Sequence, residues 1–298
     1  MRNFIFYIPT ILFVLTSGVA MLLYFSGCVP VPREMVVAGG MQDQAILRGA
    51  AVCSPELEYL TVDQHEEGID PDGFSVLSWN SHRGTHKDWR RDLVSYGSGT
   101  DIILLQEAAI EPIQDAQMDL FANQWLMATA FQLEEQEIGV LSAARVSPHA
   151  YCVSREPEPL FRIPKIGLAS AYPLAGKDAR LLVVNIHMVN FTLTPDAVGR
   201  QFDSLKSIIK NHDGPVIIAG DFNTWSDSRE TLVNERMTEL DMTQATFAPD
   251  HRVMFFNRTV DGIYYRDLEV TKSVSYNVES SDHNPIEVHF RLSENGRG

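Results

Sequence analysis

Residues 180–223 read RLLVVNIHMVNFTLTPDAVGRQFDSLKSIIKNHDGPVIIAGDFN, and they decide the fold class. The runs 180–186 and 215–219 are short, apolar and rich in β-branched residues, which predicts two buried strands. Between them, Thr194 is the predicted N-cap of a helix that continues with Pro195 at its first position. One face of this helix is apolar, through Val198, Phe202, Leu205, Ile208 and Ile209. The stretch therefore predicts a domain in which strands and helices are mixed.

Further elements flank this stretch on both sides. They are strands at 74–79 and 101–106, a second helix at 227–240, and late strands at 262–265 and 284–292. Strands and helices follow no regular alternation, so we expect one layered α/β domain from about residue 70 to 293. Residues 29–72 are interpreted as a linker that leads into this domain.

The composition is that of a globular protein and argues against broad affinity for nucleic acid. The 298 residues are 45% hydrophobic and 21% charged, with a formal net charge of −15. Proteins that bind long nucleic acids without specificity usually carry a basic face, which replaces counterions on the phosphate backbone. An acidic chain is instead suited to gather divalent cations.

The N-terminal segment, residues 1–28, is predicted to hold the protein at a membrane. Residues 4–25 carry no charged side chain, and a helix of about 20 residues crosses the hydrocarbon core of a bilayer. The segment fits a retained anchor, a cleaved signal peptide, or a lipoprotein signal ending at Cys28. Arg2 precedes it, which places the N-terminus in the cytoplasm and the domain on the periplasmic side of the inner membrane. The alternative is a cytoplasmic protein in which this segment is a buried helix.

The three cysteines, Cys28, Cys53 and Cys152, do not form a recognisable framework. Their number is odd, their spacing is wide, and no CxxC pair indicates zinc. We therefore interpret Cys53 and Cys152 as buried or free thiols, with a disulfide between them as the alternative.

Five short motifs place polar side chains at the end of an apolar strand. They are LSWN at 77–80, LLQE at 104–107, VNIH at 184–187, IAGDFN at 218–223 and SDHNP at 281–285. Strands deliver such groups to one rim of a sheet with fixed geometry, which is how a rigid scaffold presents a site. We expect these motifs to form a single site.

The side chains in and near these motifs suit metal-assisted hydrolysis of a phosphoester. Hydrolysis needs a cation on a non-bridging oxygen, an activated water, and a proton for the leaving oxygen. Carboxylates and amides are hard oxygen donors for Mg²⁺ or Mn²⁺, and imidazoles transfer protons near neutral pH. The candidates are Asn80, Glu107, His187, Asp221, Asn223, Asp261, Asp282 and His283.

In order and spacing, these motifs resemble those of the endonuclease/exonuclease/phosphatase family, the DNase I-like proteins. The resemblance covers residues 74–290, and the stretches 151–159 and 184–192 resemble its YafD-like bacterial branch. It implies a four-layer α/β sandwich, in which two mixed β-sheets face each other and helices cover the outside. It also implies a hydrolase of phosphoester bonds that depends on Mg²⁺ or Mn²⁺.

The same resemblance assigns the metal and the attacking water to particular residues. Glu107 would be the chief metal ligand, with Asn80 nearby and Asp282 completing the metal side. Asp221 would orient or deprotonate the attacking water, and Asn223 would hold phosphate or a second metal.

The two histidines take separate roles in this resemblance. His283 would contact the phosphate and transfer a proton, with Asp261 fixing its tautomer. His187 would protonate the leaving group, as in the nuclease-like members. The carboxylate partner of His187 stays open, with Glu134, Glu135 and Glu137 as the candidates.

The substrate is left open by the sequence, because one fold hosts many substrates. His187 favours a nucleic acid, whereas the acidic charge and the apolar segment favour a small or lipid phosphate. We expect a monomer. The alternative function is a catalytically silent module that binds a phosphate ligand at the membrane, which would predict gaps among the candidate residues.

Overall fold

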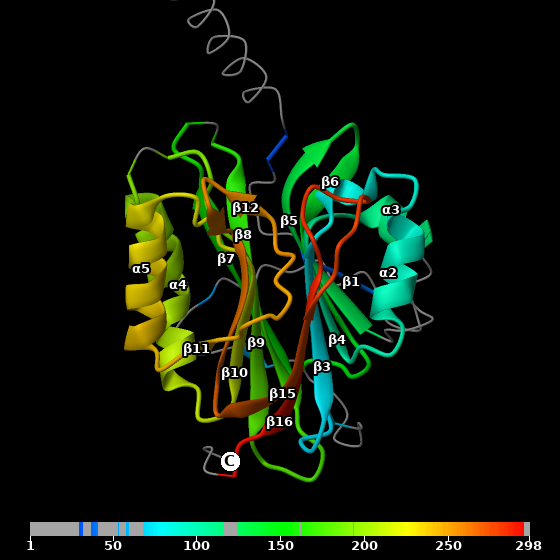
Figure 1. Cartoon of the computed structure of the whole chain (residues 1–298), viewed down its shortest axis with the longest axis vertical. Coiled ribbons are helices and arrows are strands. Elements are labelled where there is room, and N and C mark those ends of the chain that lie inside the picture. The colour runs from blue at the N-terminus through cyan, green and yellow to red at the C-terminus, as the bar shows by residue number, and fades with distance from the viewer. Residues whose placement is uncertain are drawn as a thin grey trace, which may run out of the picture.

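The computed structural model describes residues 30–31, 37–40, 53, 58–59, 68–115, 124–160, 162–192 and 194–294. Two sheets face each other and helices lie outside both of them (Figure 1). The predicted four-layer sandwich is therefore confirmed.

Each sheet has seven strands in the described part of the chain. The first sheet, in spatial order, is β1 (Val37–Gly40), β5 (Gln124–Leu133), β6 (Gln136–Ala144), β4 (Ile102–Ala109), β3 (Phe74–Asn80), β16 (Ile286–Leu292) and β15 (Leu268–Ser275). The second is β11 (Thr243–Gln244), β14 (Asp261–Arg266), β10 (Val216–Asp221), β9 (Arg180–His187), β8 (Pro164–Pro173), β7 (Ala150–Pro157) and β2 (Glu58–Tyr59). A separate hairpin pairs β12 (Met254–Phe255) with β13 (Arg258–Thr259).

The helices cover the outer faces of the two sheets. The short helix η1 (His82–Gly84) follows β3, and α2 (Trp89–Gly97) and α3 (Ile110–Asp115) lie on the side of the first sheet. On the side of the second sheet lie α4 (Asp196–Asn211) and α5 (Asp227–Glu239). β1 and β2 come from the stretch expected to be a linker, and they pair with β5 and β7.

Two apolar layers hold this arrangement together. Between the sheets, Val76 and Leu104 of the first sheet share a buried cluster with Val183 and Ile217 of the second. On the outer face of the second sheet, the predicted apolar stripe of α4 is buried as expected, with Phe202 at its centre. Full burial of a side chain of this size stabilises a fold by about 1.5–3 kcal/mol.

The start of α4 differs from the expectation by one residue. Pro195 is the N-cap, and the helix begins at Asp196. The hydroxyl of Thr194, the predicted N-cap, donates to the Asp196 carboxylate at 2.8 Å, so Thr194 belongs to the preceding loop.

Cys53 and Cys152 form a disulfide, so the interpretation as free thiols was wrong. The backbone N–H of Cys53 donates to Val153 O at 3.0 Å, which fixes the segment around Cys53 against β7. The two cysteines are 99 residues apart in the chain, and their spacing carries no sign of this tertiary contact.

The predicted membrane segment at residues 4–25 and the candidate lipidation site Cys28 lie outside the described residues. Among the helices that are described, none combines the length and the apolar character needed to cross a membrane.

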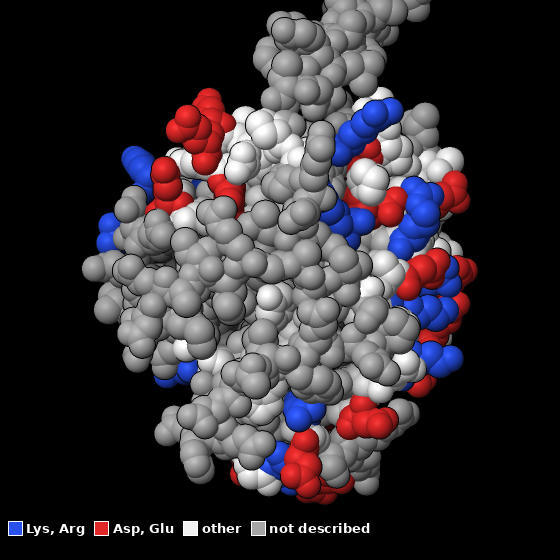
Figure 2. Space-filling view, turned by 180° about the vertical axis from the view of Figure 1, so that it is seen from behind, with Lys and Arg blue, Asp and Glu red and all other residues white. Residues whose placement is uncertain are grey.

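The described surface mixes charges of both signs. On the face in Figure 2, Lys and Arg side chains lie next to Asp and Glu side chains. Lys206 contacts Glu239 at 2.6 Å, and Arg236 contacts Asp203 at 3.4 Å. The described part of this face carries no broad basic field of the kind that a non-specific nucleic-acid binder uses.

Candidate active site

Strand register brings the predicted polar motifs to one end of the sandwich. In the second sheet, Asp221 of β10 pairs with His187 of β9 on one side and with Asp261 of β14 on the other. In the first sheet, Asn80 pairs with Gln106, so Glu107 follows directly beside it. These residues lie at the end where α3 and β12 are seen in Figure 1. The structure thus brings four of the five motifs to one end of the sandwich, and the fifth, 281–285, reaches it through the hydrogen bond from Ser281 Oγ to Asn80 O.

Asp221 is the centre of the site. It is buried, and its carboxylate accepts hydrogen bonds from Asn223 N at 2.9 Å and from Asn80 Nδ2 at 3.3 Å. Burial raises the pKa of Asp221 to about 6; His283 opposes this shift and Asp261 adds to it. A carboxylate with this pKa is a base matched to neutral pH.

The expected pair of His283 and Asp261 is present. His283 Nδ1 lies 2.8 Å from Asp261 Oδ2, and both side chains are buried. Burial lowers the pKa of His283, but the carboxylates of Asp261, Asp221 and Asp282 together outweigh burial and raise the pKa to about 10. His283 is thus an imidazolium at neutral pH, and its Nε2 lies 4.0 Å from Asp221 Oδ2.

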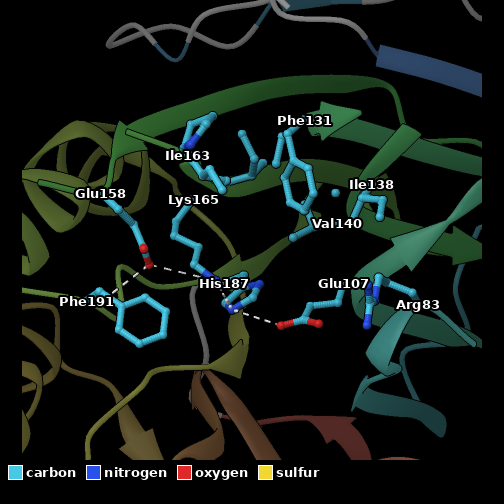
Figure 3. Close-up of a pocket in the computed structure, with 14 residues that line it drawn as sticks. Arg83, Glu107, Phe131, Ile138, Val140, Glu158, Ile163, Lys165, His187 and Phe191 are labelled. Atoms are coloured by element: carbon cyan, nitrogen blue, oxygen red, sulfur yellow. Dashed lines mark hydrogen bonds and ion pairs between the residues drawn. The ribbon is translucent and has the colours of Figure 1, made fainter. Parts of the chain in front are cut away.

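His187 has neighbours that the sequence did not indicate (Figure 3). Its Nε2 lies 2.7 Å from Lys165 Nζ, 3.4 Å from Asp221 Oδ2 and 4.0 Å from Glu107 Oε1. Burial lowers the pKa of His187 well below its usual value, and the charges of Lys165 and His283 lower it further. The imidazole is therefore neutral at neutral pH.

The carboxylate partner of His187 was sought in the wrong segment. Glu134 and Glu135 occupy the turn between β5 and β6, and Glu137 accepts a hydrogen bond from Thr129. Among the described carboxylates, those of Asp221 and Glu107 approach His187: Asp221 lies on the neighbouring strand β10 of the same sheet, and Glu107 comes from the facing sheet.

Lys165 and Glu158 are site residues that the sequence reasoning missed. Lys165 lies at the start of β8, with a side chain that is only 16% exposed. Its Nζ is 3.9 Å from Glu158 Oε1, and that oxygen also accepts from the backbone N–H of Asn190 at 2.8 Å. The one available signal was a lysine at the edge of an otherwise apolar strand.

The proposed metal ligands come from three adjoining chain segments. Ser81, next to Asn80, donates through Oγ to the backbone carbonyl of Glu107 at 3.3 Å. Ser281, next to Asp282, donates through Oγ to Asn80 O at 2.7 Å. Hydrogen bonds thus bind all three segments together at the rim.

The donor set has the chemistry that Mg²⁺ or Mn²⁺ requires. The Glu107 side chain is 33% exposed and points into the pocket, while Asp282 is 57% exposed and lies 3.5 Å from His82. Hard oxygens at an accessible rim fit either ion. Within the described ranges, no three or more His, Cys, Asp or Glu side chains are already gathered as a metal-binding group. The metal site stays a prediction.

Asn223 lies two residues after the end of β10 and adopts the left-handed conformation, with φ of +50°. Its Nδ2 donates to Met188 O at 3.0 Å, which locks the side chain beside Asp221. The role of Asn223 toward phosphate or a second metal stays a prediction.

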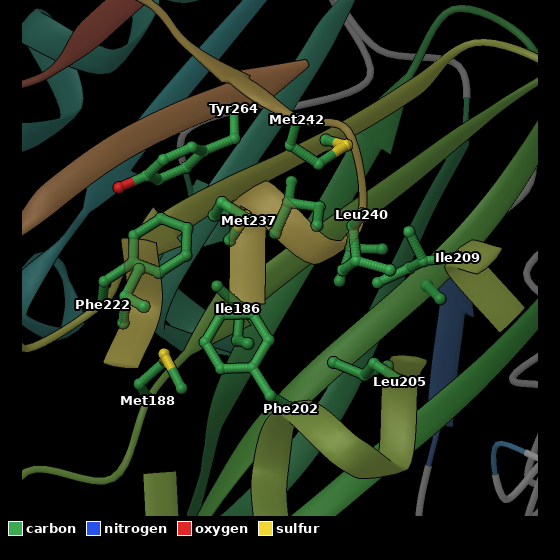
Figure 4. Close-up of a cluster of buried hydrophobic side chains, with 14 of the residues drawn as sticks. Ile186, Met188, Phe202, Leu205, Ile209, Phe222, Met237, Leu240, Met242 and Tyr264 are labelled. Atoms are coloured by element: carbon green, nitrogen blue, oxygen red, sulfur yellow. The ribbon is translucent and has the colours of Figure 1, made fainter. Parts of the chain in front are cut away.

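An apolar cluster beneath this row makes the site rigid (Figure 4). Ile186 and Phe222 are the chain neighbours of His187 and Asp221, and both are buried with Met188. Phe222 packs edge-on against Tyr264 of β14, with ring centroids 5.1 Å apart. His187 and Asp221 therefore each stand next to a side chain fixed in the core.

A cavity of about 210 Å³ opens beside His187 and Glu107. Its polar lining includes Arg83, Glu107, Glu158, Lys165 and His187. Its remaining wall is apolar, with Phe131, Ile138, Val140, Ile163 and Phe191 around it (Figure 3).

Known proteins share both sequence and fold with this chain. A UPF0294 protein of Vibrio vulnificus is 36% identical over 228 residues, which cover 75% of this chain and 79% of the relative. The mannosyl-6-phosphatase Bt3783 of Bacteroides thetaiotaomicron has a TM-score of 0.54 at 15% identity, covering 74% of this chain and all of that one. TDP2 of D. rerio, complexed with a single-strand DNA product, has a TM-score of 0.53 at 16% identity, covering 74% and 99%.

The two solved structures establish the fold alone, because their sequence identity is low. The family assignment rests on the sequence model of the endonuclease/exonuclease/phosphatase family, which matches residues 77–283. This range includes every candidate site residue, from Asn80 to His283. The chain belongs to the endonuclease/exonuclease/phosphatase family.

Proposed function

We propose that this phosphoester hydrolase depends on Mg²⁺ or Mn²⁺ held by Asn80, Glu107 and Asp282. The observation that carries the proposal is the buried row His187–Asp221–Asp261 beside a rim of hard oxygen donors. When bound, the metal would place positive charge on a non-bridging phosphate oxygen. The chain's own residues would do the rest.

Asp221 prepares the attacking water. Its pKa of about 6 lets it hold a proton from water during attack and release that proton afterwards. The hydrogen bonds from Asn223 N and Asn80 Nδ2 fix the direction in which its carboxylate points.

His283 binds the phosphate as a cation. The Asp261 carboxylate accepts a hydrogen bond from His283 Nδ1–H, so His283 Nε2–H is left to donate to a non-bridging phosphate oxygen. The 4.0 Å between His283 Nε2 and Asp221 Oδ2 places this donor beside the base that prepares the water.

Lys165 serves the leaving oxygen. It carries the positive charge next to His187 and lines the catalytic cavity together with Glu107. Glu158, buried beneath it, holds the ammonium group in place. This role replaces the one first expected for His187, whose Nε2 accepts from Lys165.

The location of the domain is part of the same proposal. Disulfides persist in oxidising compartments, so Cys53–Cys152 supports a domain outside the cytoplasm. It agrees with a tether through residues 4–25 or through lipid on Cys28.

The test uses the full-length protein in non-ionic detergent with bis(p-nitrophenyl) phosphate and p-nitrophenyl phosphate. Chelation with EDTA should abolish hydrolysis, and Mg²⁺ or Mn²⁺ should restore it. Glu107→Gln should raise the Mg²⁺ concentration for half-maximal activity by at least about 10-fold. It should also remove the rise in Tm that Mg²⁺ produces in the wild type.

Glu111→Gln is the matched control, because the Glu111 side chain is exposed and accepts a hydrogen bond from Gln136 Nε2 at 2.7 Å, away from the proposed metal ligands. It should behave as wild type. Hydrolysis that persists after complete metal removal would contradict metal dependence. A folded chain that binds phosphate esters but turns over none would support the silent-module alternative.

A further inference from the structure

A second and larger cavity adjoins the catalytic one. It has a volume of about 650 Å³, and its described lining includes Leu160, Phe191, Thr194, Asp196, Arg200 and Trp225. We call it the apolar groove. Phe191 lines both the groove and the catalytic cavity, so its half-exposed ring lies at the boundary between the two spaces.

Exposed apolar side chains gather around this opening. Phe191 is 52% exposed and Leu160 is 49% exposed, although both are large and apolar. Phe256, the most exposed large apolar residue of the described chain, lies 6.3 Å from the ring of Trp225. Phe255 lies 6.3 Å from the ring of His283. Apolar surface concentrated at one opening marks a site that a ligand covers.

The charged side chains of the groove offer no site for a second phosphate. Arg200 donates to Glu156 Oε1 through Nε at 2.9 Å and through Nη2 at 2.7 Å. Asp196 accepts a hydrogen bond from the hydroxyl of Thr194 and keeps its negative charge, which repels a phosphate. Hence the described lining offers no unpaired cation for a second phosphate, and the part of the ligand in the groove carries no charge.

Trp225 is held so that its ring forms a fixed wall. Its Nε1–H donates to Asn190 Oδ1 at 2.8 Å, and the Arg229 guanidinium lies 4.6 Å from the ring centroid. Arg229 is itself buried and donates to the carbonyl oxygens of Val189 and Asn190. The indole is therefore anchored from the protein side.

We propose that the substrate is an amphiphilic phosphoester: the catalytic groups take its phosphate, and the apolar groove takes an alkyl or acyl chain. The inference rests on the proposed hydrolase function and names its substrate class. A nucleic acid is the competing ligand, since bases stack on aromatic rings. A polynucleotide would also bring further phosphates into the groove, where the described cations are already paired.

The test compares p-nitrophenyl alkyl phosphodiesters that carry a methyl, hexyl or dodecyl group, with full-length protein in a constant amount of non-ionic detergent. Because burial of each methylene favours binding, kcat/KM should rise by at least about tenfold from the methyl to the hexyl ester. Leu160→Ser and Trp225→Ala should lose most of this rise. Met254→Ser, which changes an exposed apolar side chain outside the groove, should keep it.

A second measurement does not depend on turnover. A bromoalkyl phosphate should quench the fluorescence of the wild type more than that of Trp225→Phe, because bromine in the groove lies against the indole. The other three tryptophans, and any bromoalkyl phosphate that binds to the N-terminal segment, are the same in both proteins, so the difference in quenching reports Trp225 alone. Equal quenching would overturn the inference.

The outcomes separate this inference from the proposed function. If the methyl ester is hydrolysed and kcat/KM does not change with chain length, the groove does not bind the chain, while the hydrolase function stands. Faster hydrolysis of a single-stranded oligonucleotide than of the hexyl ester would also overturn the inference. If no ester is hydrolysed but Trp225 is quenched, the groove stands and the proposed function fails.

Discussion

Lys165 Nζ lies 2.7 Å from His187 Nε2, and this contact determines what each side chain can do. Burial lowers the pKa of His187, and Lys165 lowers it further. An imidazole that is neutral and accepts at Nε2 has no proton at that nitrogen to give. The ammonium group of Lys165 has such a proton, and it lines the cavity beside Glu107.

Lys165→Met should therefore lower kcat by about 10²–10⁴-fold, the range of a lost acid–base group, with a smaller change in KM. His187→Gln should cost less, because an amide oxygen still accepts from Lys165. Lys177→Met is the control, since Lys177 is exposed in the turn after β8. The measurement is steady-state hydrolysis, by variants with wild-type Tm, of a phosphoester whose leaving group is an alkoxide, because p-nitrophenolate leaves without needing a proton. Near-wild-type kcat in Lys165→Met would refute the assignment.

His283 and Asp261 should act as a unit. His283→Ala removes the donor to the phosphate, so kcat should fall by about 10²–10⁴-fold while KM changes little. Asp261→Asn keeps the shape of the pair but loses the charge that supports the imidazolium, so its loss should be smaller. The double variant should be little worse than His283→Ala, because the coupling is direct. Multiplicative losses in the double variant would mean that the two residues act separately.

The elements predicted from the sequence are those whose signals are local. The α4 helix and its flanking strands were found because an apolar stripe and two apolar runs fall within one stretch. β5, β6, β7, β8 and β15 were not predicted. β15 alternates only weakly and lies at the sheet edge, and its register to β16 shifts at Val270. Such strands are defined by the neighbours they pair with, which a sequence window does not contain.

The candidate site divides along the same line. Asp221, Asp261 and His283 were predicted because a polar residue at the end of an apolar strand can be recognised as a site candidate without knowing which strand pairs with it. Lys165 was missed because a lysine at the start of a strand usually faces solvent. The pairing of Gly167 with Ile186 brings Lys165 close to His187. This register between β8 and β9 exists only in the folded protein and is not encoded in a local stretch of sequence.

His212 should make stability depend on pH. Its Nε2 lies 2.8 Å from Arg180 O, and burial lowers its pKa below the usual 6.5, with the charge of Arg266 adding to this. The unfolded chain takes up the proton first, so the free energy of unfolding is unaffected above about pH 6.5 and falls as the pH drops below it. His212→Gln keeps an N–H donor for Arg180 O but has no group that titrates. The Tm of this variant should therefore fall less between pH 7 and pH 5 than the Tm of the wild type. An identical fall in both proteins would contradict this role.

The Cys53–Cys152 disulfide should contribute measurably to stability. Because it closes a long loop, its removal by Cys152→Ser should cost about 2–4 kcal/mol of unfolding free energy. For a domain of this size that corresponds to a Tm lower by roughly 4–16 °C. Cys28→Ser is the control, because Cys28 takes no part in the bond, and its Tm should equal that of the wild type.

The same bond tests the compartment. The test treats intact cells with a maleimide, which labels free thiols, and then isolates the chain. If the domain lies outside the cytoplasm, Cys53 and Cys152 should stay unlabelled, because the disulfide protects them until a reductant is added. A cytoplasmic domain would instead meet a reducing thiol pool, and both cysteines would react at once. The reductant should also lower the Tm of the wild type to that of Cys152→Ser and leave the variant unchanged, since only the wild type has the bond to lose. Rapid labelling of both thiols in intact cells, with no effect of reductant on Tm, would place the domain in the cytoplasm.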